Sequence, residues 1–265
     1  MPLSTRRMVR PAARDFYGAT LRALLESGVP LLVGGAFALK FYAGINRDTK
    51  DLDLFLRERD VPFAREVLEN AGFRTELTFP HWLGKAWSEP HFVDIIFSSA
   101  NGLCPVDDAW FDNAVKCTLF GAPVLLCPIE EVIWTKCFVM ERERFDGADI
   151  CHLIESGGET IDWNRLLDRF GPHWRVLLGH LTLFDFVYPG SRHKVPSWVM
   201  EDLSRRLAEE HTSEAPGLCQ GTLVSREQYL VDLRERGYAD ARVAPFGTVP
   251  EAEIARWTDA IGKIK

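Results

Sequence analysis

Three aspartates in apolar surroundings are the residues of this chain best suited to chemistry. Asp51 and Asp53 alternate with leucines, and Asp94 interrupts the apolar run of residues 92–97. Because strand side chains repeat every two residues, Asp51 and Asp53 should share one face while the leucines face a core. Carboxylates in strands of this kind are costly unless a cation lies among them. The pattern therefore predicts a divalent metal site formed by Asp51, Asp53 and Asp94. The alternatives are two solvated carboxylates on an edge strand for Asp51 and Asp53, and a buried ion pair for Asp94.

A glycine pair upstream of these aspartates adds a second chemical feature. Gly34 and Gly35 follow the apolar residues 31–33 and precede a segment with helical character. Glycine lets backbone N–H groups approach a polyphosphate closely, and a helix N-terminus favours anions. Mg²⁺ is usually held by one or two carboxylates together with substrate phosphates. We therefore predict two Mg²⁺ ions, with Mn²⁺ as the alternative, beside a bound triphosphate, which is the arrangement for phosphoryl or nucleotidyl transfer.

The ordered set of motifs resembles the nucleotidyltransferase superfamily of the DNA polymerase β type. That superfamily has an apolar residue, Gly, then Gly or Ser, a short helix, Asp-x-Asp and a third Asp on a later strand. The corresponding residues here are Val33-Gly34-Gly35, Asp51-Leu52-Asp53 and Asp94. Residues 34–53 and 130–150 look most like the minimal, AbiEii-like branch, and the resemblance spans about residues 25 to 155. Two departures are Ala36, where no serine hydroxyl follows the first glycine, and a long gap from Gly35 to Asp51.

The resemblance implies a reaction and a role for each acidic residue. A nucleoside monophosphate would pass from a nucleoside triphosphate (NTP) to an acceptor hydroxyl, and pyrophosphate would leave. Asp51 and Asp53 would hold the two ions, while Asp94 would complete the first metal site and deprotonate or orient the acceptor. Gly34 and Gly35 would bind the triphosphate through their backbone amides.

Three basic residues are further candidates for phosphate contact. The resemblance implies that Lys136, on a predicted helix, reaches the β- or γ-phosphate as a point charge. Its alternative is an exposed helical lysine. Arg47 and Lys50 precede the aspartate pair and either contact phosphates or only offset the local negative charge. We also expect Arg144, Asp146 and Asp149 to form a structural network, although Arg142 and Arg144 could instead shape an acceptor site.

Several functions stay open at this point. The acceptor could be a small molecule, a protein side chain or the 3′ end of an RNA. The alternative to an enzyme is a catalytically silent nucleotide-binding or partner-binding module, and the AbiEii resemblance adds an antitoxin partner as an option. A third reading is a plain structural α/β domain. Neither a Walker-type phosphate loop nor Gly-x-Ser-x-Gly occurs, and the seven histidines lack metal-binding spacing.

Composition indicates an ordinary globular protein. The chain has 265 residues, 46% of them hydrophobic and 26% charged, which allows one large or two modest domains. A net charge of −7 argues against broad nucleic-acid binding. No apolar run is long enough to span a bilayer and residues 1–14 are not a secretory signal, so we expect a cytoplasmic protein without membrane contact. The six cysteines lack a Cys-x-x-Cys pair and should be free thiols.

Periodicity and punctuation place these residues in an α+β protein. We expect an N-terminal catalytic domain over residues 1–127, with a nucleotidyltransferase-type mixed β-sheet and flanking helices, and a helical domain over residues 128–265. In the first domain, helices are predicted at 13–26, 36–42 and 62–71, the second of them closed by Gly44. Strands are predicted at 31–33, 51–56, 73–79, 92–97, 115–119 and 124–127, with residues 120–123 as a turn. In the second domain, helices are predicted at 129–142, 147–155, 163–170, 173–187, 197–209, 225–237 and after Pro250, with a loop at 211–222. Asp162 is the predicted N-cap of the helix at 163–170, and a capping box at Ser225 opens the helix at 225–237.

Overall fold

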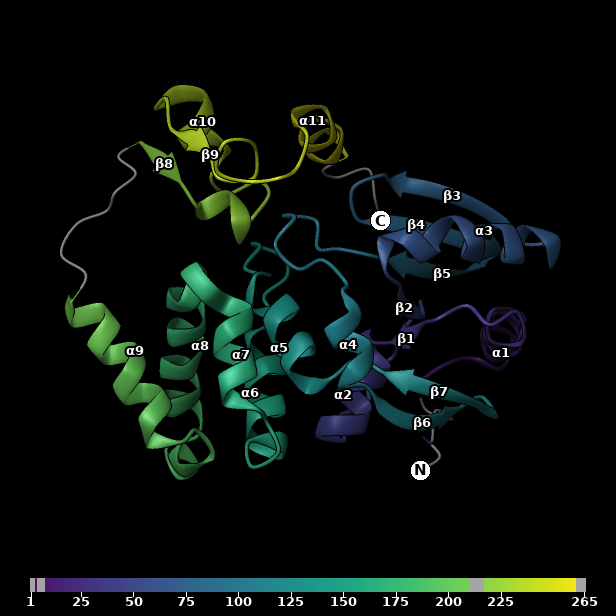
Figure 1. Cartoon of the computed structure of the whole chain (residues 1–265), viewed down its shortest axis with the longest axis horizontal. Helices are drawn as coiled ribbons and strands as arrows, with labels where there is room; N and C mark the ends of the chain where they lie inside the picture. Colours follow the sequence, from purple (N-terminus) through teal and green to yellow (C-terminus); the bar gives the residue numbers. More distant parts are fainter. Residues whose placement is uncertain (1–2, 4–7, 210–216, 261–265) are drawn as a thin grey trace. The chain divides into compact units, whose positions relative to one another are not determined.

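A computed structural model describes residue 3 and residues 8–209 and 217–260 of the chain. The chain divides into two compact units, Met1–Pro128 and Ile129–Lys265, which we call the N-terminal and C-terminal units. The N-terminal unit combines a mixed sheet with helices, and the C-terminal unit is mainly helical (Figure 1). The predicted α+β fold class is thus confirmed. We propose that the two units are the catalytic and helical domains expected from the sequence.

The N-terminal unit is built on a seven-stranded sheet in the order β3-β4-β5-β2-β1-β7-β6. The pairs β2–β5 and β1–β7 are parallel and the other neighbours are antiparallel, so the sheet is mixed. The strands are β1 Leu32–Val33, β2 Asp53–Phe55, β3 Arg74–Phe79, β4 Leu83–Ser88, β5 His91–Ile96, β6 Val115–Leu119 and β7 Ala122–Leu126.

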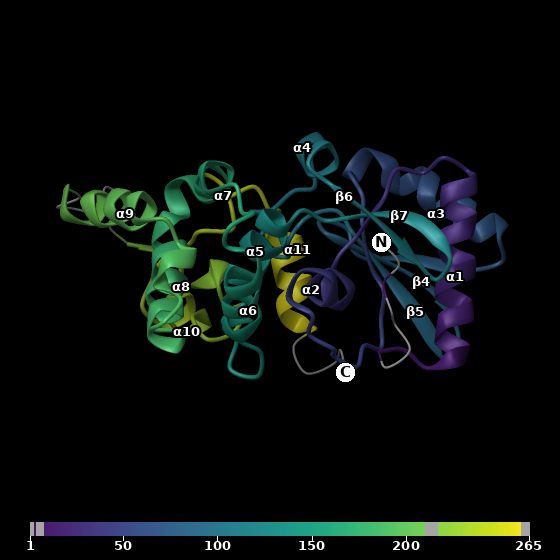
Figure 2. The same cartoon turned by 90° about the horizontal axis from the view of Figure 1, so that it is seen from below.

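Helices α1 Pro11–Glu26 and α3 Val61–Asn70 pack on one face of this sheet and close the core. The other helices of the unit are α2 Gly35–Ala43, the 3₁₀ turn Glu58–Asp60 and α4 Asp108–Asp112. Residues of α1 and α3 share one buried apolar cluster with strand residues such as Leu54 and Ile95. Figure 2 shows α1 lying along β5 and β7, and the contacts between these elements agree. The leucines that alternate with the aspartates of residues 51–53 therefore face the core, as predicted.

Helix ends in this unit follow the sequence signals. Proline stands in the first turn of α1, where its missing N–H costs nothing. Helix α2 ends at Gly44, which has a φ of 70° and donates its N–H to the Lys40 carbonyl. A left-handed residue of this kind is a common helix terminator that glycine adopts without strain. The predicted end of this helix at Gly44 is confirmed.

Some predicted boundaries in the N-terminal unit are wrong. Strand β2 begins at Asp53, so Asp51 lies just before the strand, and β4 and α4 were not predicted at all. The turn between β6 and β7 consists only of Phe120 and Gly121, whose φ values are 51° and 84°. Two residues with positive φ suit the twist of a tight hairpin, so the strand can resume at Ala122.

The C-terminal unit packs helices and one small parallel sheet. Its α-helices are α5 Ile129–Cys137, α6 Gly147–Gly157, α7 Trp163–Phe170, α8 Trp174–Val187, α9 Ser197–Glu209, α10 Leu230–Glu235 and α11 Glu251–Asp259. Its 3₁₀ helices are Gly171–His173, Arg192–Lys194 and Gly221–Leu223, and its two strands are β8 Leu218–Cys219 and β9 Ala239–Asp240. The predicted N-cap of α7 is confirmed, because the Asp162 carboxylate accepts a hydrogen bond from the Arg165 N–H at 3.1 Å.

Three predictions in this unit differ from the structure. The helix predicted over 129–142 ends at Cys137, since the Met140 N–H donates to the Val224 carbonyl and Met140 bridges to Phe145. The predicted loop contains β8 and a 3₁₀ turn, while its residues 211–216 lie outside the described part. Ser225 does accept the Gln228 N–H at 3.2 Å, but the helix begins only at Leu230.

All six cysteines lie among the described residues, none of them forms a disulfide, and five are buried, as expected for core thiols. Among the described residues, every helix is too short or too polar to cross a lipid bilayer.

Candidate active site

The three predicted aspartates converge in the N-terminal unit. Asp51, Asp53 and Asp94 each offer one carboxylate oxygen, and these oxygens lie within 4.8 Å of one another. All three residues are partly buried. Like charges at such separation repel, and an ion between them would remove the repulsion. Three hard oxygen donors in one cluster fit the ligand preference of Mg²⁺ or Mn²⁺.

Strand pairing explains why residues about forty positions apart meet. In the parallel pair β2–β5, Asp53 lies directly opposite Asp94. The Asp94 N–H also donates to the Leu52 carbonyl at 3.0 Å, which fixes the register just before β2 begins. Asp51 lies outside the ladder and is held by Thr49, whose hydroxyl donates to its carboxylate at 2.7 Å. The sheet thus positions two of the carboxylates and a side-chain hydrogen bond positions the third.

The glycine pair is required by the position of Asp53. Gly35 has a φ of 53°, and a Cβ built there would lie 1.7 Å from the Asp53 Oδ2 atom. A Cβ at Gly34 would lie 2.3 Å from the Phe55 ring. The Gly34 N–H donates to the Asp53 carbonyl at 3.0 Å. The pair therefore allows the chain to turn tightly over β2 while the Asp53 carboxylate lies against Gly35.

The backbone donors near the aspartates belong to the first turn of α2. The Gly34 N–H is bonded to the Asp53 carbonyl, and a triphosphate contact of the glycine pair stays a prediction. The first intrahelical bond of α2 runs from the Ala38 N–H to the Gly34 carbonyl at 3.2 Å. The N–H groups of Gly35, Ala36 and Phe37 precede it and have no acceptor within the helix. These amides form the anion-favouring end of α2.

One residue of the site was missed by sequence reasoning. The Lys85 ammonium donates to the Asp94 Oδ1 atom at 2.5 Å, and it lies 4.2 Å from the centre of the Phe92 ring. Lys85 is opposite Asp94 in the antiparallel pair β4–β5. The turn at Glu89 and Pro90 sets this register, so recognising the hairpin would have identified the lysine.

Burial and charge act against each other at Asp94. Burial raises the pKa of its carboxyl, the Lys85 ammonium lowers it, and the Asp51 carboxylate raises it further. The net effect is a pKa above the usual value for an aspartate. A carboxylate with a raised pKa accepts a proton more readily than an exposed aspartate.

A buried tyrosine lies within reach of the field of these carboxylates. Burial raises the pKa of Tyr17, and the charges of Asp51, Asp53 and Asp94 raise it further, so the pKa lies well above its usual range. Its hydroxyl has no hydrogen-bond partner among the described residues. Tyr17 therefore stays neutral and contributes no additional negative charge.

The predicted phosphate-binding residues lie in both units. Arg47 and Lys50 are exposed in the segment between α2 and β2. Lys136 is on α5 in the C-terminal unit and is largely buried, so the alternative of an exposed lysine is wrong. Its ammonium lies 2.9 Å from Asp146 and 2.7 Å from Asp149. A phosphate contact of all three basic residues stays a prediction.

The expected acidic network in the C-terminal unit is confirmed, and Lys136 is part of it. Arg144 pairs with Asp146 at 3.1 Å, and Lys136 joins Asp146 to Asp149. Burial would raise the pKa of Asp146, but the charges and hydrogen bonds of Arg144 and Lys136 outweigh it and lower the pKa. The network holds the start of α6 against α5.

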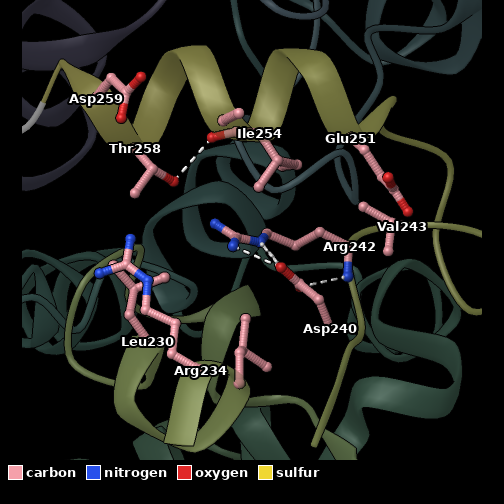
Figure 3. Close-up of a pocket in the computed structure, with 11 residues that line it drawn as sticks. Leu230, Arg234, Asp240, Arg242, Val243, Glu251, Ile254, Thr258 and Asp259 are labelled. Atoms are coloured by element: carbon pink, nitrogen blue, oxygen red, sulfur yellow. Dashed lines mark hydrogen bonds and ion pairs between the residues drawn. The ribbon is translucent and has the colours of Figure 1, made fainter. Parts of the chain in front are cut away.

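A cavity of about 330 Å³ lies among residues of the C-terminal unit. Figure 3 shows Arg242 and Asp240 in its wall, joined by hydrogen bonds, below the helix that carries Ile254 and Thr258. The Arg242 side chain is fully buried, and its Nη2 atom lies 2.6 Å from the Asp240 Oδ2 atom. This charge is balanced within the wall, so the pair is a structural ion pair.

We expect Asp240→Asn to destabilise the protein by about 3 kcal/mol at pH 7, since it leaves the buried Arg242 without a counter-charge. Burial would raise the pKa of Asp240, but Arg242 outweighs it and holds the pKa below its usual value. The stabilisation is thus complete above the pKa of an unfolded aspartate, about 3.9, and is lost as the pH falls through the folded pKa. Urea unfolding from pH 7 to pH 3 should show this difference shrinking.

The control is Asp259→Asn, which changes an exposed carboxylate of the same cavity. It should unfold like the wild-type protein at every pH. Equal stability of the Asp240→Asn variant and the wild-type protein at pH 7 would contradict the assigned ion pair.

Three proteins of known structure are similar to this chain. The antibiotic-resistance factor ANT(2'')-Ia is 19% identical over 65% of this chain and 98% of its own, with a TM-score of 0.43. The lincosamide antibiotic adenylyltransferase LnuA is 15% identical over 55% of this chain and 97% of its own, with a TM-score of 0.39. An antigenic nucleotidyltransferase-like protein from Paracoccidioides brasiliensis is 14% identical over 66% of this chain and 94% of its own, with a TM-score of 0.39.

The sequence comparisons give one family. No curated protein matches the chain significantly. Residues 13–168, more than half of the chain, match the family described as nucleotidyl transferase of unknown function (DUF2204). This span includes the glycine pair, all three aspartates and Lys136. The chain therefore belongs to this family of nucleotidyltransferases, as the motifs predicted.

Proposed function

We propose that this protein is a metal-dependent nucleotidyltransferase that moves a nucleoside monophosphate from an NTP to an acceptor hydroxyl. The observation that carries the proposal is the convergence of Asp51, Asp53 and Asp94 beside the first turn of α2. Three acidic ligands and a set of backbone donors in one place are the groups that a triphosphate and its ions require. Family membership supports nucleotidyl transfer as the chemistry.

The three acidic residues would have different roles. Asp51 and Asp53 would hold two Mg²⁺ or Mn²⁺ ions, and Asp94 would complete one of the two sites. Bound divalent ions would offset the charge of the triphosphate and of the leaving pyrophosphate. Asp94 would also deprotonate or orient the acceptor hydroxyl, as a carboxylate within the site can.

The bond changes follow from these positions. The acceptor oxygen forms a bond with the α-phosphorus and gives its proton to Asp94. The bond between the α-phosphorus and the bridging oxygen breaks, and pyrophosphate leaves with the electron pair. The amides at the start of α2, with Arg47 and Lys50, would hold the phosphates during this exchange. The phosphate contact that the resemblance implies for Lys136 is a separate prediction.

The acceptor is a small molecule, a protein side chain or the 3′ end of an RNA. The net charge of −7 disfavours RNA, because nucleic-acid affinity depends on neutralising phosphates with basic residues. The resemblance to AbiEii-like proteins favours a macromolecule and adds an antitoxin as a partner to test. These alternatives differ in where the transferred nucleotide is found.

The test is Mg²⁺-dependent pyrophosphate release from a panel of nucleoside triphosphates, with and without cell extract. We expect release that requires both the metal and an acceptor. Label from the α-phosphate should then appear on RNA, protein or a small molecule, which names the acceptor class. Binding of ATP without transfer of label under any condition would favour the nucleotide-binding module instead.

A further inference from the structure

Lys85 is the charged neighbour of the aspartate cluster that no sequence motif includes. Its side chain is 16% exposed, and that of Asp94 is 15% exposed, so the pair is largely removed from water. Its ammonium lies 2.5 Å from one carboxylate oxygen of Asp94, Oδ1. A charge-assisted hydrogen bond between partly buried groups is strong and directional.

The lysine is itself held in place by the sheet. It faces Asp94 across the β4–β5 ladder, and its ammonium lies 4.2 Å from the centre of the Phe92 ring, an attractive cation–π distance. Asp53 lies on the other side of Asp94, across the β5–β2 ladder. Lys85, Asp94 and Asp53 therefore form one row across three neighbouring strands.

The two carboxylate oxygens of Asp94 have different roles in this row. Lys85 occupies Oδ1 on the β4 side, which leaves Oδ2 for a ligand. The ammonium also offsets one of the three negative charges of the cluster.

We propose that Lys85 is the positioning residue of this site: it fixes the Asp94 carboxylate through Oδ1 and weakens divalent-ion binding by the triad. This inference rests on the proposed function. Two opposite consequences follow from removing the ammonium. Asp94 becomes freer to rotate, which slows transfer, while the cluster becomes more negative, which tightens ion binding.

The direct test measures ions alone. Mn²⁺ binding to the protein without nucleotide, followed by electron paramagnetic resonance, should be about tenfold tighter in Lys85→Met, the effect of one unit charge about 6 Å from a dication in a water-like dielectric. Lys85→Arg keeps the charge and should bind Mn²⁺ like the wild-type protein. Unchanged or weaker binding in Lys85→Met would overturn the proposal.

The second test uses turnover. In Lys85→Met we expect kcat for pyrophosphate release to fall about 10–100-fold, as for other residues that orient a metal ligand. KM for the NTP should change less than about threefold, because the phosphates contact other groups. Lys85→Arg should recover part of kcat. If Lys85 had a purely structural role, Lys85→Arg would not recover kcat and Lys85→Met would not bind Mn²⁺ more tightly. Either result would contradict the proposal.

Controls separate the proposal from folding and from the proposed function. Lys116→Met removes an exposed lysine of β6 in the same sheet and should leave Mn²⁺ binding and turnover unchanged. Thermal unfolding checks each variant, and Lys85→Gln replaces Lys85→Met in both measurements if the latter does not fold. A wild-type protein that binds Mn²⁺ but transfers nothing would refute the proposed function, while the Mn²⁺ comparison would still decide the role of Lys85.

Discussion

Gly35→Ala should lower the rate of nucleotidyl transfer by about 10²-fold or more, because displacing a reacting group by about 1 Å can cost that much. The new Cβ would lie 1.7 Å from the Asp53 Oδ2 atom, so the carboxylate must move. A carboxylate is the flexible end of a side chain and can rotate aside, which spares the fold. The main loss should therefore be in transfer and in Mn²⁺ affinity, rather than in stability.

Gly44→Ala is the matched control for this variant. Gly44 also has a positive φ, 70°, but a Cβ there meets nothing within 4 Å. Both variants carry the backbone cost of an alanine in the left-handed region, roughly 1–2 kcal/mol, and only one disturbs Asp53. Steady-state pyrophosphate release and unfolding midpoints, measured on both, should show similar stabilities and different rates. Equal rates would show that the position of Asp53 is not critical for transfer.

Asp53→Asn should reduce transfer by about 10²–10³-fold, the loss typical of removing one preorganised charged group from an active site. Asparagine keeps the size of the side chain and removes the charge that a divalent ion requires. In a chelator, the variant should unfold at a higher temperature than the wild-type protein, because one of three clustered negative charges is gone. Added Mn²⁺ should raise the unfolding temperature of the wild-type protein only, since ligands stabilise the state that binds them.

The control for this charge change is Asp48→Asn, an exposed carboxylate in the segment that leads to Asp51. It should behave like the wild-type protein in turnover and in the Mn²⁺-dependent shift of unfolding temperature. If the Asp53→Asn variant kept both wild-type turnover and the Mn²⁺-dependent shift of unfolding temperature, the metal-site assignment would be wrong. The hypothesis of a plain structural α/β domain would then be favoured.

The ordered motifs determined the superfamily and the fold class and identified the three aspartates as one candidate cluster. The motifs themselves are local or nearly so: a glycine pair before a helix, alternation of aspartate with leucine, and a carboxylate within an apolar run. Helix ends at Gly44 and at the Asp162 N-cap were equally readable, because capping depends on residues within one turn. Such signals can be recognised from a few neighbouring residues, without knowledge of the rest of the chain.

Other features depended on which strands pair. The sequence missed β4, and with it Lys85, because the partner of Asp94 is set by the β4–β5 register rather than by nearby residues. It also extended α5 past Cys137, where a backbone bond to Val224 replaces the helical one. Strand β2 also decides the bonding of the Gly34 amide, which donates to the Asp53 carbonyl.

The sequence alone therefore determined which groups could perform chemistry in this protein, since residue type and short spacing fix ligand chemistry and helix ends. The tertiary structure decided how those groups are held. It paired Asp94 with Lys85, pressed Asp53 against Gly35 and enclosed Lys136 between two aspartates. Contacts between residues distant in the chain arise from strand register and packing, which only the folded sheet and helices specify.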